Sequence, residues 1–148
     1  MYRKILVAVE NGPADARLLP HVSALAKQVG AELLLLHVAD GWAARNFEQL
    51  KLAESDEMKA DSEYLERTAD GIRAGGLRVD TLLALGNPPN EIVRIAAETG
   101  CDLIALASHG HKLIGDILHG STIDKVRHNT TIPLLVVSAA KVATRPPV

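Results

Sequence analysis

The apolar residues of the chain gather in five short runs, separated by longer segments of mixed polarity. Four of the runs are nearly continuous, a pattern typical of strands that are covered on both faces in a parallel sheet. The third run mixes polar and apolar residues less regularly, which favours a position toward an edge of the sheet. The five predicted strands are Ile5–Val9, Glu32–Val38, Val79–Leu85, Asp102–Ser108 and Pro133–Ser138.

Between these runs, apolar residues recur at intervals of three and four, which places them on one face of a helix. In the first such segment, Leu18, Val22, Leu25 and Val29 follow this spacing. Gly30 comes next, and glycine is a common residue just past a helix end. Patterns of this kind predict helices over residues 14–30, 47–76, 89–100 and 121–129. The many charges of residues 48–67 are expected to form the solvated face of the second helix.

Strands that alternate with helices predict an α/β fold with a parallel sheet and right-handed crossovers. We expect a single domain over residues 1–148, a doubly wound, Rossmann-like five-stranded parallel sheet with helices on both faces, and an exposed tail over residues 139–148. In such sheets, ligands bind at the carboxyl ends of the strands, where the winding reverses. This rule selects the residues that follow the strands, which are 10–12, 38–42, Gly86 and 108–121.

The composition is that of an ordinary soluble domain, with 47% hydrophobic residues, 23% charged residues and a formal net charge of −2. This balance, with only 3% aromatic residues, argues against nucleic acid or a membrane as a partner. The first apolar run is too short for a signal peptide, so we expect a cytoplasmic protein. Cys101 is expected to be a small buried residue rather than a reactive thiol.

The segment SHGHKLIGDILHGS, Ser108–Ser121, follows the fourth predicted strand and carries three glycines. It is not a Walker loop, because Asp116 stands where that motif requires lysine. The turn after the first strand, VENGPAD, holds one glycine and so lacks the dinucleotide fingerprint. Standard P-loop enzymes and standard NAD enzymes are therefore both disfavoured.

A simpler anion site remains at the start of the last predicted helix, where Gly120 and Ser121 precede Thr122. The N–H groups and the positive end of a helix favour an anion there, and glycine lets a phosphate approach the backbone. The alternative is purely structural: Gly110 makes a turn, Gly120 makes a bend, and Ser121 caps the helix. The spacing alone leaves both interpretations open.

The stretch ALASHGHKLIGDILHGSTIDKVRHNTTIPLLVVS resembles the signature region of the universal stress protein family. The nucleotide-binding branch of that family carries Gly-x2-Gly-x9-Gly-[Ser/Thr]. In this chain the pattern reads Ala107, Gly110 and, after nine residues, Gly120 followed by Ser121. ILVAVENG and LLLLHVAD are similar to the first two strands of the family with their turns, and the resemblance extends from about residue 5 to residue 137.

The resemblance implies an adenine nucleotide alpha hydrolase-like fold, usually dimeric, that binds ATP or a related adenine nucleotide, with or without Mg²⁺ or Mn²⁺. By position, the main chain of Val38 would meet adenine, and the turn Ala8–Glu10, with Val9, would lie beside the nucleoside. The phosphates would be surrounded by Gly110, Gly120, Ser121 and Thr122, and Ala107 and His111 complete the expected nucleotide site. The last strand, Pro133–Ser138, is a candidate homodimer edge, because an apolar edge must be covered.

Two residues depart from the family pattern. Ala107 replaces the first motif glycine, which would cost about 1–2 kcal/mol at a positive φ and little in an extended strand. Glu10 replaces the usual aspartate, and its extra methylene shifts the carboxylate. We therefore expect an ATP-binding stress-response regulator, and the alternative is a dimeric interaction protein of the same fold that binds no nucleotide.

The remaining histidines and lysine have two interpretations each. His109, His111 and His119 could form a zinc site, but the resemblance favours solvent or phosphate neighbours, and a protonated imidazole would make binding sensitive to pH. Lys112 either assists a phosphate or solvates the loop. His37, inside the second predicted strand, is expected to be a hydrogen-bonded core residue. No nucleophile–base–orienter set is visible, so we expect weak or no hydrolysis and disfavour a phosphotransfer or adenylating enzyme.

Overall fold

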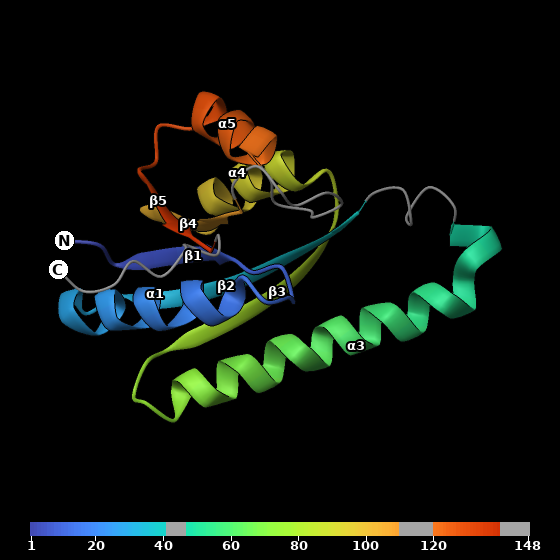
Figure 1. Cartoon of the computed structure of the whole chain (residues 1–148), viewed down its shortest axis with the longest axis horizontal. Helices are drawn as coiled ribbons and strands as arrows, with labels where there is room; N and C mark the ends of the chain where they lie inside the picture. Colours follow the sequence, from blue (N-terminus) through green and yellow to red (C-terminus); the bar gives the residue numbers. More distant parts are fainter. Residues whose placement is uncertain (41–46, 110–119, 140–148) are drawn as a thin grey trace, which may run out of the picture.

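The computed structural model describes residues 1–40, 47–109 and 120–139. Strands and helices alternate along this part of the chain (Figure 1). Their bounds are β1 Lys4–Ala8, α1 Asp15–Val29, β2 Glu32–Asp40, α3 Phe47–Arg73, β3 Val79–Gly86, α4 Pro88–Glu98, β4 Leu103–Ser108, α5 Gly120–Asn129 and β5 Leu134–Ser138. The predicted strands and helices agree with these elements to within a few residues.

The five strands form one parallel sheet in the order β3-β2-β1-β4-β5. The chain moves outward from β1 through β2 to β3, and then returns to place β4 on the other side of β1. The winding therefore reverses between β1 and β4, as the doubly wound prediction requires. β3 lies at one edge, where its less regular apolar pattern placed it, and β5 lies at the other.

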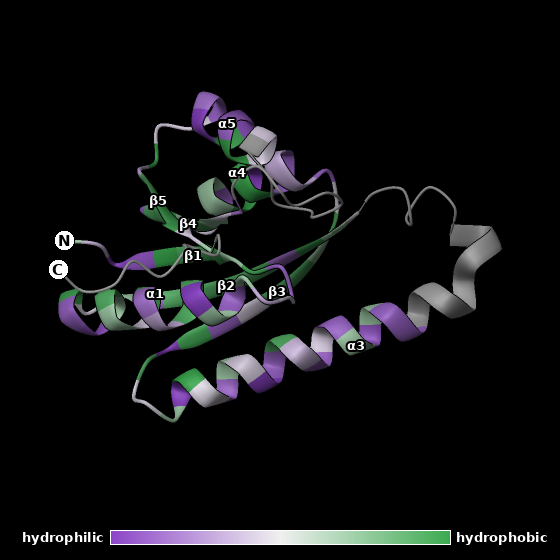
Figure 2. Cartoon of the chain, viewed as in Figure 1, coloured by the Kyte–Doolittle hydropathy of each residue, from purple (hydrophilic) through white to green (hydrophobic). Residues whose placement is uncertain are grey.

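Helices cover both faces of the sheet, with α1 and α3 on one face and α4 and α5 on the other (Figure 1). Alternate residues of each strand therefore enter two separate cores, because successive side chains of a strand point to opposite faces. Figure 2 shows largely hydrophobic strands between helices that carry many hydrophilic residues. This double cover explains the continuous apolar runs in the sequence.

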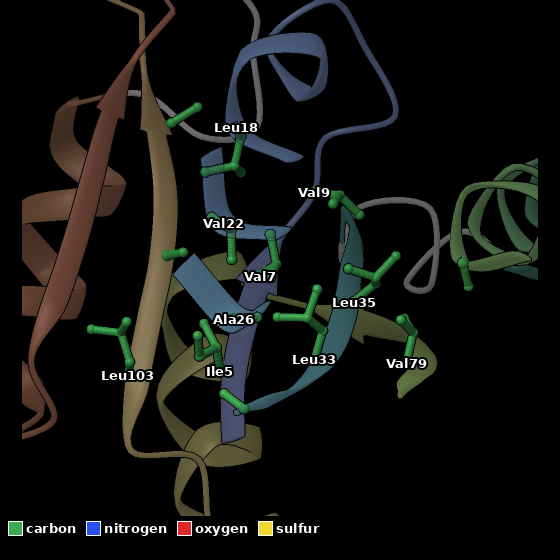
Figure 3. Packing of buried hydrophobic residues seen from close by; sticks show 14 of the residues in the cluster. Ile5, Val7, Val9, Leu18, Val22, Ala26, Leu33, Leu35, Val79 and Leu103 are labelled. Atoms are coloured by element: carbon green, nitrogen blue, oxygen red, sulfur yellow. The ribbon is translucent and has the colours of Figure 1, made fainter. Parts of the chain in front are cut away.

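The core under α1 contains the helical face predicted from the sequence. Leu18 and Val22 are fully buried and pack against Ile5 and Val7 of β1 (Figure 3). Gly30 ends α1 in the left-handed conformation, with φ of 75°, and its N–H donates to the carbonyl of Ala26 at 2.8 Å. Glycine adopts this conformation without strain because it has no Cβ, and the sequence predicted a glycine helix end here.

The core under α4 and α5 is built in the same way from the other face of the strands. Its central helical residues are Ile92, Ile95 and Val126, all nearly inaccessible to solvent. Cys101 is also buried in this core, which confirms the expectation of a small buried residue. Burial raises the pKa of its thiol, so the reactive thiolate is disfavoured.

The two edges of the sheet differ in what covers them. On β3, Arg73 donates from Nε and Nη2 to the carbonyl oxygen of Val79, and Thr81 bonds to Glu66 of α3. Neighbouring carbonyls of a strand point to opposite sides, and that of Arg78 already accepts from β2. Arg73 therefore occupies an outward-facing acceptor of the β3 edge.

Among the described helices, no helix is both long and apolar enough to cross a bilayer.

Candidate functional site

The turn between β1 and α1 is folded around the carboxylate of Asp15. Asp15 is 1% exposed, and its two oxygens accept from the backbone N–H groups of Glu10 at 3.0 Å and Asn11 at 2.9 Å. Asn11 has a φ of 58°, a left-handed conformation that asparagine tolerates better than most residues. An acidic residue in the first turn of a helix is also favoured by the helix dipole. These hydrogen bonds therefore hold the turn in one conformation at the carboxyl edge of the sheet.

Burial raises the pKa of the Asp15 carboxyl above its ordinary value, although the backbone hydrogen bonds of the turn act in the opposite direction. The hydroxyl of Tyr64, from α3, donates to Oδ2 of Asp15 at 3.3 Å. Burial, and after it the negative charge of Asp15, raises the pKa of Tyr64. Sequence reasoning missed Asp15, although an acidic residue at the start of a predicted helix was a signal that could have found it.

His37 of β2 is a buried, hydrogen-bonded residue, as predicted. Its Nδ1 lies 3.0 Å from the carbonyl oxygen of Val9, and because a carbonyl only accepts, Nδ1 carries the hydrogen. Its Nε2 lies 3.5 Å from Oδ2 of Asp61 on α3. The other oxygen of Asp61 accepts from the side-chain amide of Asn11 at 2.9 Å. Side chains of α3 thus tie the ends of β1 and β2 together.

At the switch point, Glu10 and His109 form a buried pair. Nε2 of His109 lies 2.7 Å from Oε1 and 2.5 Å from Oε2 of Glu10. Glu10 follows β1 and His109 follows β4, the two strands between which the winding reverses. In the sequence analysis the two residues have separate expected roles, Glu10 beside the nucleoside and His109 beside solvent or phosphate. Their pairing was not predicted, because 99 positions separate them in the chain.

The predicted site residues within the strands are all buried. Ala8 ends β1 and Val9 directly follows it, and Val38 lies near the end of β2 opposite Ala84 of β3. Ala107 is fully buried in β4, paired with Val137 of β5. Since Ala107 is an extended strand residue, its methyl group imposes no backbone strain, and of the two costs considered for it the small one applies.

The last described part of the site is the start of α5. Gly120 opens the helix, the side chain of Ser121 is exposed, and Thr122 is 4% exposed. The helix follows β4 and runs back toward the start of β5, so its positive end lies at the carboxyl edge of the sheet. Gly110 and His111, like Lys112 and His119, lie outside the described residues.

The histidines give no described metal site. Within residues 1–40, 47–109 and 120–139, no group of three or more His, Cys, Asp or Glu side chains could hold a metal ion. The zinc alternative depended on His111 and His119, which the structure does not describe, so it stays untested.

A model of the universal stress protein family matches residues 1–138. The chain belongs to this family. Universal stress protein MJ0577 of Methanocaldococcus jannaschii is 31% identical over 93% of this chain and 95% of its own length. The structure of MJ0577 superposes with a TM-score of 0.78 at 29% identity, covering 96% of this chain and 99% of that chain. The resemblance found in the sequence is thereby confirmed at the level of family and fold.

Two further universal stress proteins share the fold at lower identity, and both are nucleotide complexes. One is in complex with cAMP, with a TM-score of 0.67 and 20% identity over 93% of this chain and 97% of that one. The other, from Archaeoglobus fulgidus, is in complex with dAMP, with a TM-score of 0.63 and 18% identity over 93% and 98% of the two chains. These structures show that the fold can hold an adenine nucleotide.

Proposed function

We propose that this universal stress protein binds ATP or a related adenine nucleotide in the crevice between β1 and β4, and acts as a cytoplasmic stress-response regulator. The observation that carries the proposal is the meeting of three parts at one sheet edge. These are the turn after β1, the end of β4 at His109, and the start of α5 at Gly120–Thr122. The topology rule places ligands at this edge independently of family membership.

The described residues offer groups that match the parts of an adenine nucleotide. The start of α5 combines a glycine, two hydroxyls and the positive end of a helix dipole, which together suit a phosphate. Main-chain groups of Val38, and the turn at Val9 and Glu10, would face the nucleoside. Gly110 and His111 are proposed as further residues of the same nucleotide site. A Mg²⁺ or Mn²⁺ ion would come with the phosphates.

Hydrolysis is expected to be weak or absent. General-base catalysis needs a carboxylate or imidazole aimed at the attacking water. Glu10 is a buried carboxylate at the crevice, but it is held by His109 instead. The proposed role therefore depends on whether the nucleotide is bound or absent, and not on its hydrolysis.

The test is calorimetric titration with ATP and Mg²⁺ of the wild type and a Gly120→Asp variant. Aspartate suits a helix start, so the variant should fold, but its charge would repel the phosphates. We expect saturable binding that weakens at least tenfold in the variant, because the added charge lies within a few ångströms of the anion. Gly71→Asp is the matched control, since Gly71 is exposed on α3 and an added Cβ there meets nothing within 4 Å.

Failure of the folded wild type to bind any adenine nucleotide would overturn the proposal. The protein would then be assigned to the alternative, a dimeric interaction module of the same fold that works without a nucleotide.

A further inference from the structure

One helical turn of α3 contacts the turn between β1 and α1 at two points. The side-chain amide of Asn11 donates to Oδ1 of Asp61 at 2.9 Å, and the hydroxyl of Tyr64 donates to Oδ2 of Asp15 at 3.3 Å. Asp61 and Tyr64 are three residues apart, so they lie on the same face of the helix. Because they come from positions 50 and 49 residues further along the chain, they restrain the turn from outside its own segment.

The two contacts act on the residues that set the conformation of this turn. Asn11 has a φ of 58°, which few residues adopt. Asp15 accepts from the backbone N–H groups of Glu10 and Asn11, so the turn closes around its carboxylate. Asp61 therefore restrains the residue with the unusual backbone, and Tyr64 restrains the carboxylate at the centre of the turn.

Asp61 also lies beside the second strand of the proposed nucleoside site. Its Oδ2 is 3.5 Å from Nε2 of His37, and Nδ1 of His37 donates to the carbonyl oxygen of Val9 at 3.0 Å. Val38, whose main chain is proposed to meet the base, follows His37 directly. The side chain of Asp61 is only 22% exposed, so water has limited access to compete for its contacts. One side chain of α3 thus contacts the ends of both β1 and β2.

The position of α3 makes these contacts informative. α3 is 27 residues long, and Figure 1 shows that it runs along the sheet and continues beyond the carboxyl ends of the strands. Asp61 and Tyr64 lie in the middle of the helix, at the level of that edge. The same two residues therefore connect the turn of the proposed site to the helix as a whole.

We infer that Asp61 and Tyr64 are positioning residues of the nucleotide site, and that through them nucleotide binding and the docking of α3 on the sheet favour each other. The inference rests on the proposed function, because it requires a nucleoside against the turn after β1. A site binds with its intrinsic affinity only in the fraction of molecules that have the competent conformation. Loss of a restraining contact lowers this fraction, and by linkage a ligand that selects the restrained turn also favours the contact.

The first experiment compares the affinities of ATP and adenosine for the wild type, Asp61→Ala and Asp61→Asn by calorimetric titration. Asp61→Ala should weaken binding of each ligand by about three- to tenfold, as expected when one hydrogen bond no longer holds the turn. The two losses should be equal, because the turn faces the nucleoside that both ligands share. Asp61→Asn keeps an acceptor oxygen for the amide of Asn11, so it should recover most of the affinity.

Tyr64→Phe is the second variant, because it removes only the hydroxyl that reaches Asp15. Its hydrogen bond is the longer of the two, so both ligands should be weakened less than by Asp61→Ala. Leu65→Val is the matched control for a loss of stability alone. Leu65 is 2% exposed in the core between the sheet and its helices, and the smaller side chain should lower the stability in urea without changing either affinity.

A second measurement needs no variant protein. Amide hydrogen exchange reports local opening of the backbone. Saturating ATP should slow exchange in the turn at Glu10 and Asn11, and also in α3 around residues 61–64, where the proposal places no ligand contact. The slowing in α3 should exceed that in α4, which covers the opposite face of the sheet and serves as the internal reference.

The outcomes separate the two proposals. If the wild type and Asp61→Ala bind ATP equally well, the positioning role is wrong and nucleotide binding stands. An equal loss of affinity in Leu65→Val, or no recovery in Asp61→Asn, would also overturn the inference. Protection of the turn without protection of α3 would overturn the coupling. If the wild type binds no adenine nucleotide, both proposals fail.

Discussion

Asp15 shows how one residue sets the shape of the loop that the candidate site needs. Its two oxygens collect N–H groups from successive residues, so the turn needs no glycine at Asn11 despite the positive φ there. Aspartate is common at the start of a helix, so the sequence could predict the preference of Asp15 for that place. The sequence could not show that it is buried or that Tyr64 reaches it from another helix.

Asp15→Asn should destabilise the fold by about 1–3 kcal/mol, because an amide has one acceptor oxygen and leaves a backbone N–H of the turn without a partner. Chemical denaturation at neutral pH would measure this loss. Asp80→Asn, on the exposed side of β3, is the control and should change stability little.

The stability of the wild type should also carry a pH signature of Asp15. The pKa of Asp15 is raised on folding, so its protonation favours the folded state. The resulting contribution is complete below the unfolded pKa of about 3.9 and is lost as pH rises through the folded value. Unfolding free energies from acid to neutral pH should therefore fall less in Asp15→Asn than in the wild type. An identical pH profile for the two proteins would contradict the burial of an ionisable group here.

At the scale of elements, α3 does more than cover the sheet. The charged stretch of residues 48–67 was predicted to be solvated, and for exposed members such as Glu57 this holds. Asp61, however, turns inward, accepts from the side-chain amide of Asn11 and lies beside His37, so it joins α3 to the ends of β1 and β2. Helical spacing reveals which residues share a face, but not which charged residue meets a loop 50 positions earlier in the chain.

Asp61→Ala should therefore destabilise the protein by about 1–3 kcal/mol, since it leaves the part-buried side-chain amide of Asn11 without its acceptor. Asp70→Ala on the same helix is the control. Asp70 is 72% exposed and forms a surface pair with Arg73, so its loss should cost no more than about 1 kcal/mol. Equal effects of the two substitutions in urea denaturation would refute the inward role of Asp61.

At the scale of the whole molecule, the sheet has two edges of different character. Arg73 donates to an outward-facing carbonyl of β3, whereas Val136 of β5 is 44% exposed.

Apolar runs and glycines were enough to predict the strands, the helices and the switch point, because each depends on local periodicity or on general rules of connection. The contacts that complete the site, Glu10 with His109 and Asp61 with Asn11, join distant positions and needed the structure.

We expect a homodimer through β5, because an open apolar edge favours pairing with a second copy. Val136→Lys should shift the protein toward monomers in sedimentation velocity. Leu82→Lys is the matched control on the opposite edge, where the parent side chain is 38% exposed, and it should leave the assembly unchanged. A monomeric wild type, or a dimer lost only in the control, would exclude β5 as the interface.

The central place of β1 has a consequence for synthesis of the chain. β1 leaves the ribosome well before one of its two neighbours, β4, which begins only at Leu103. While the residues between β1 and β4 are being made, one flank of this apolar strand therefore has no strand to pair with, and such flanks promote aggregation. The crevice between β1 and β4 also cannot exist until β4 has been made, so a ligand of this site would recognise only chains in which β4 is already present.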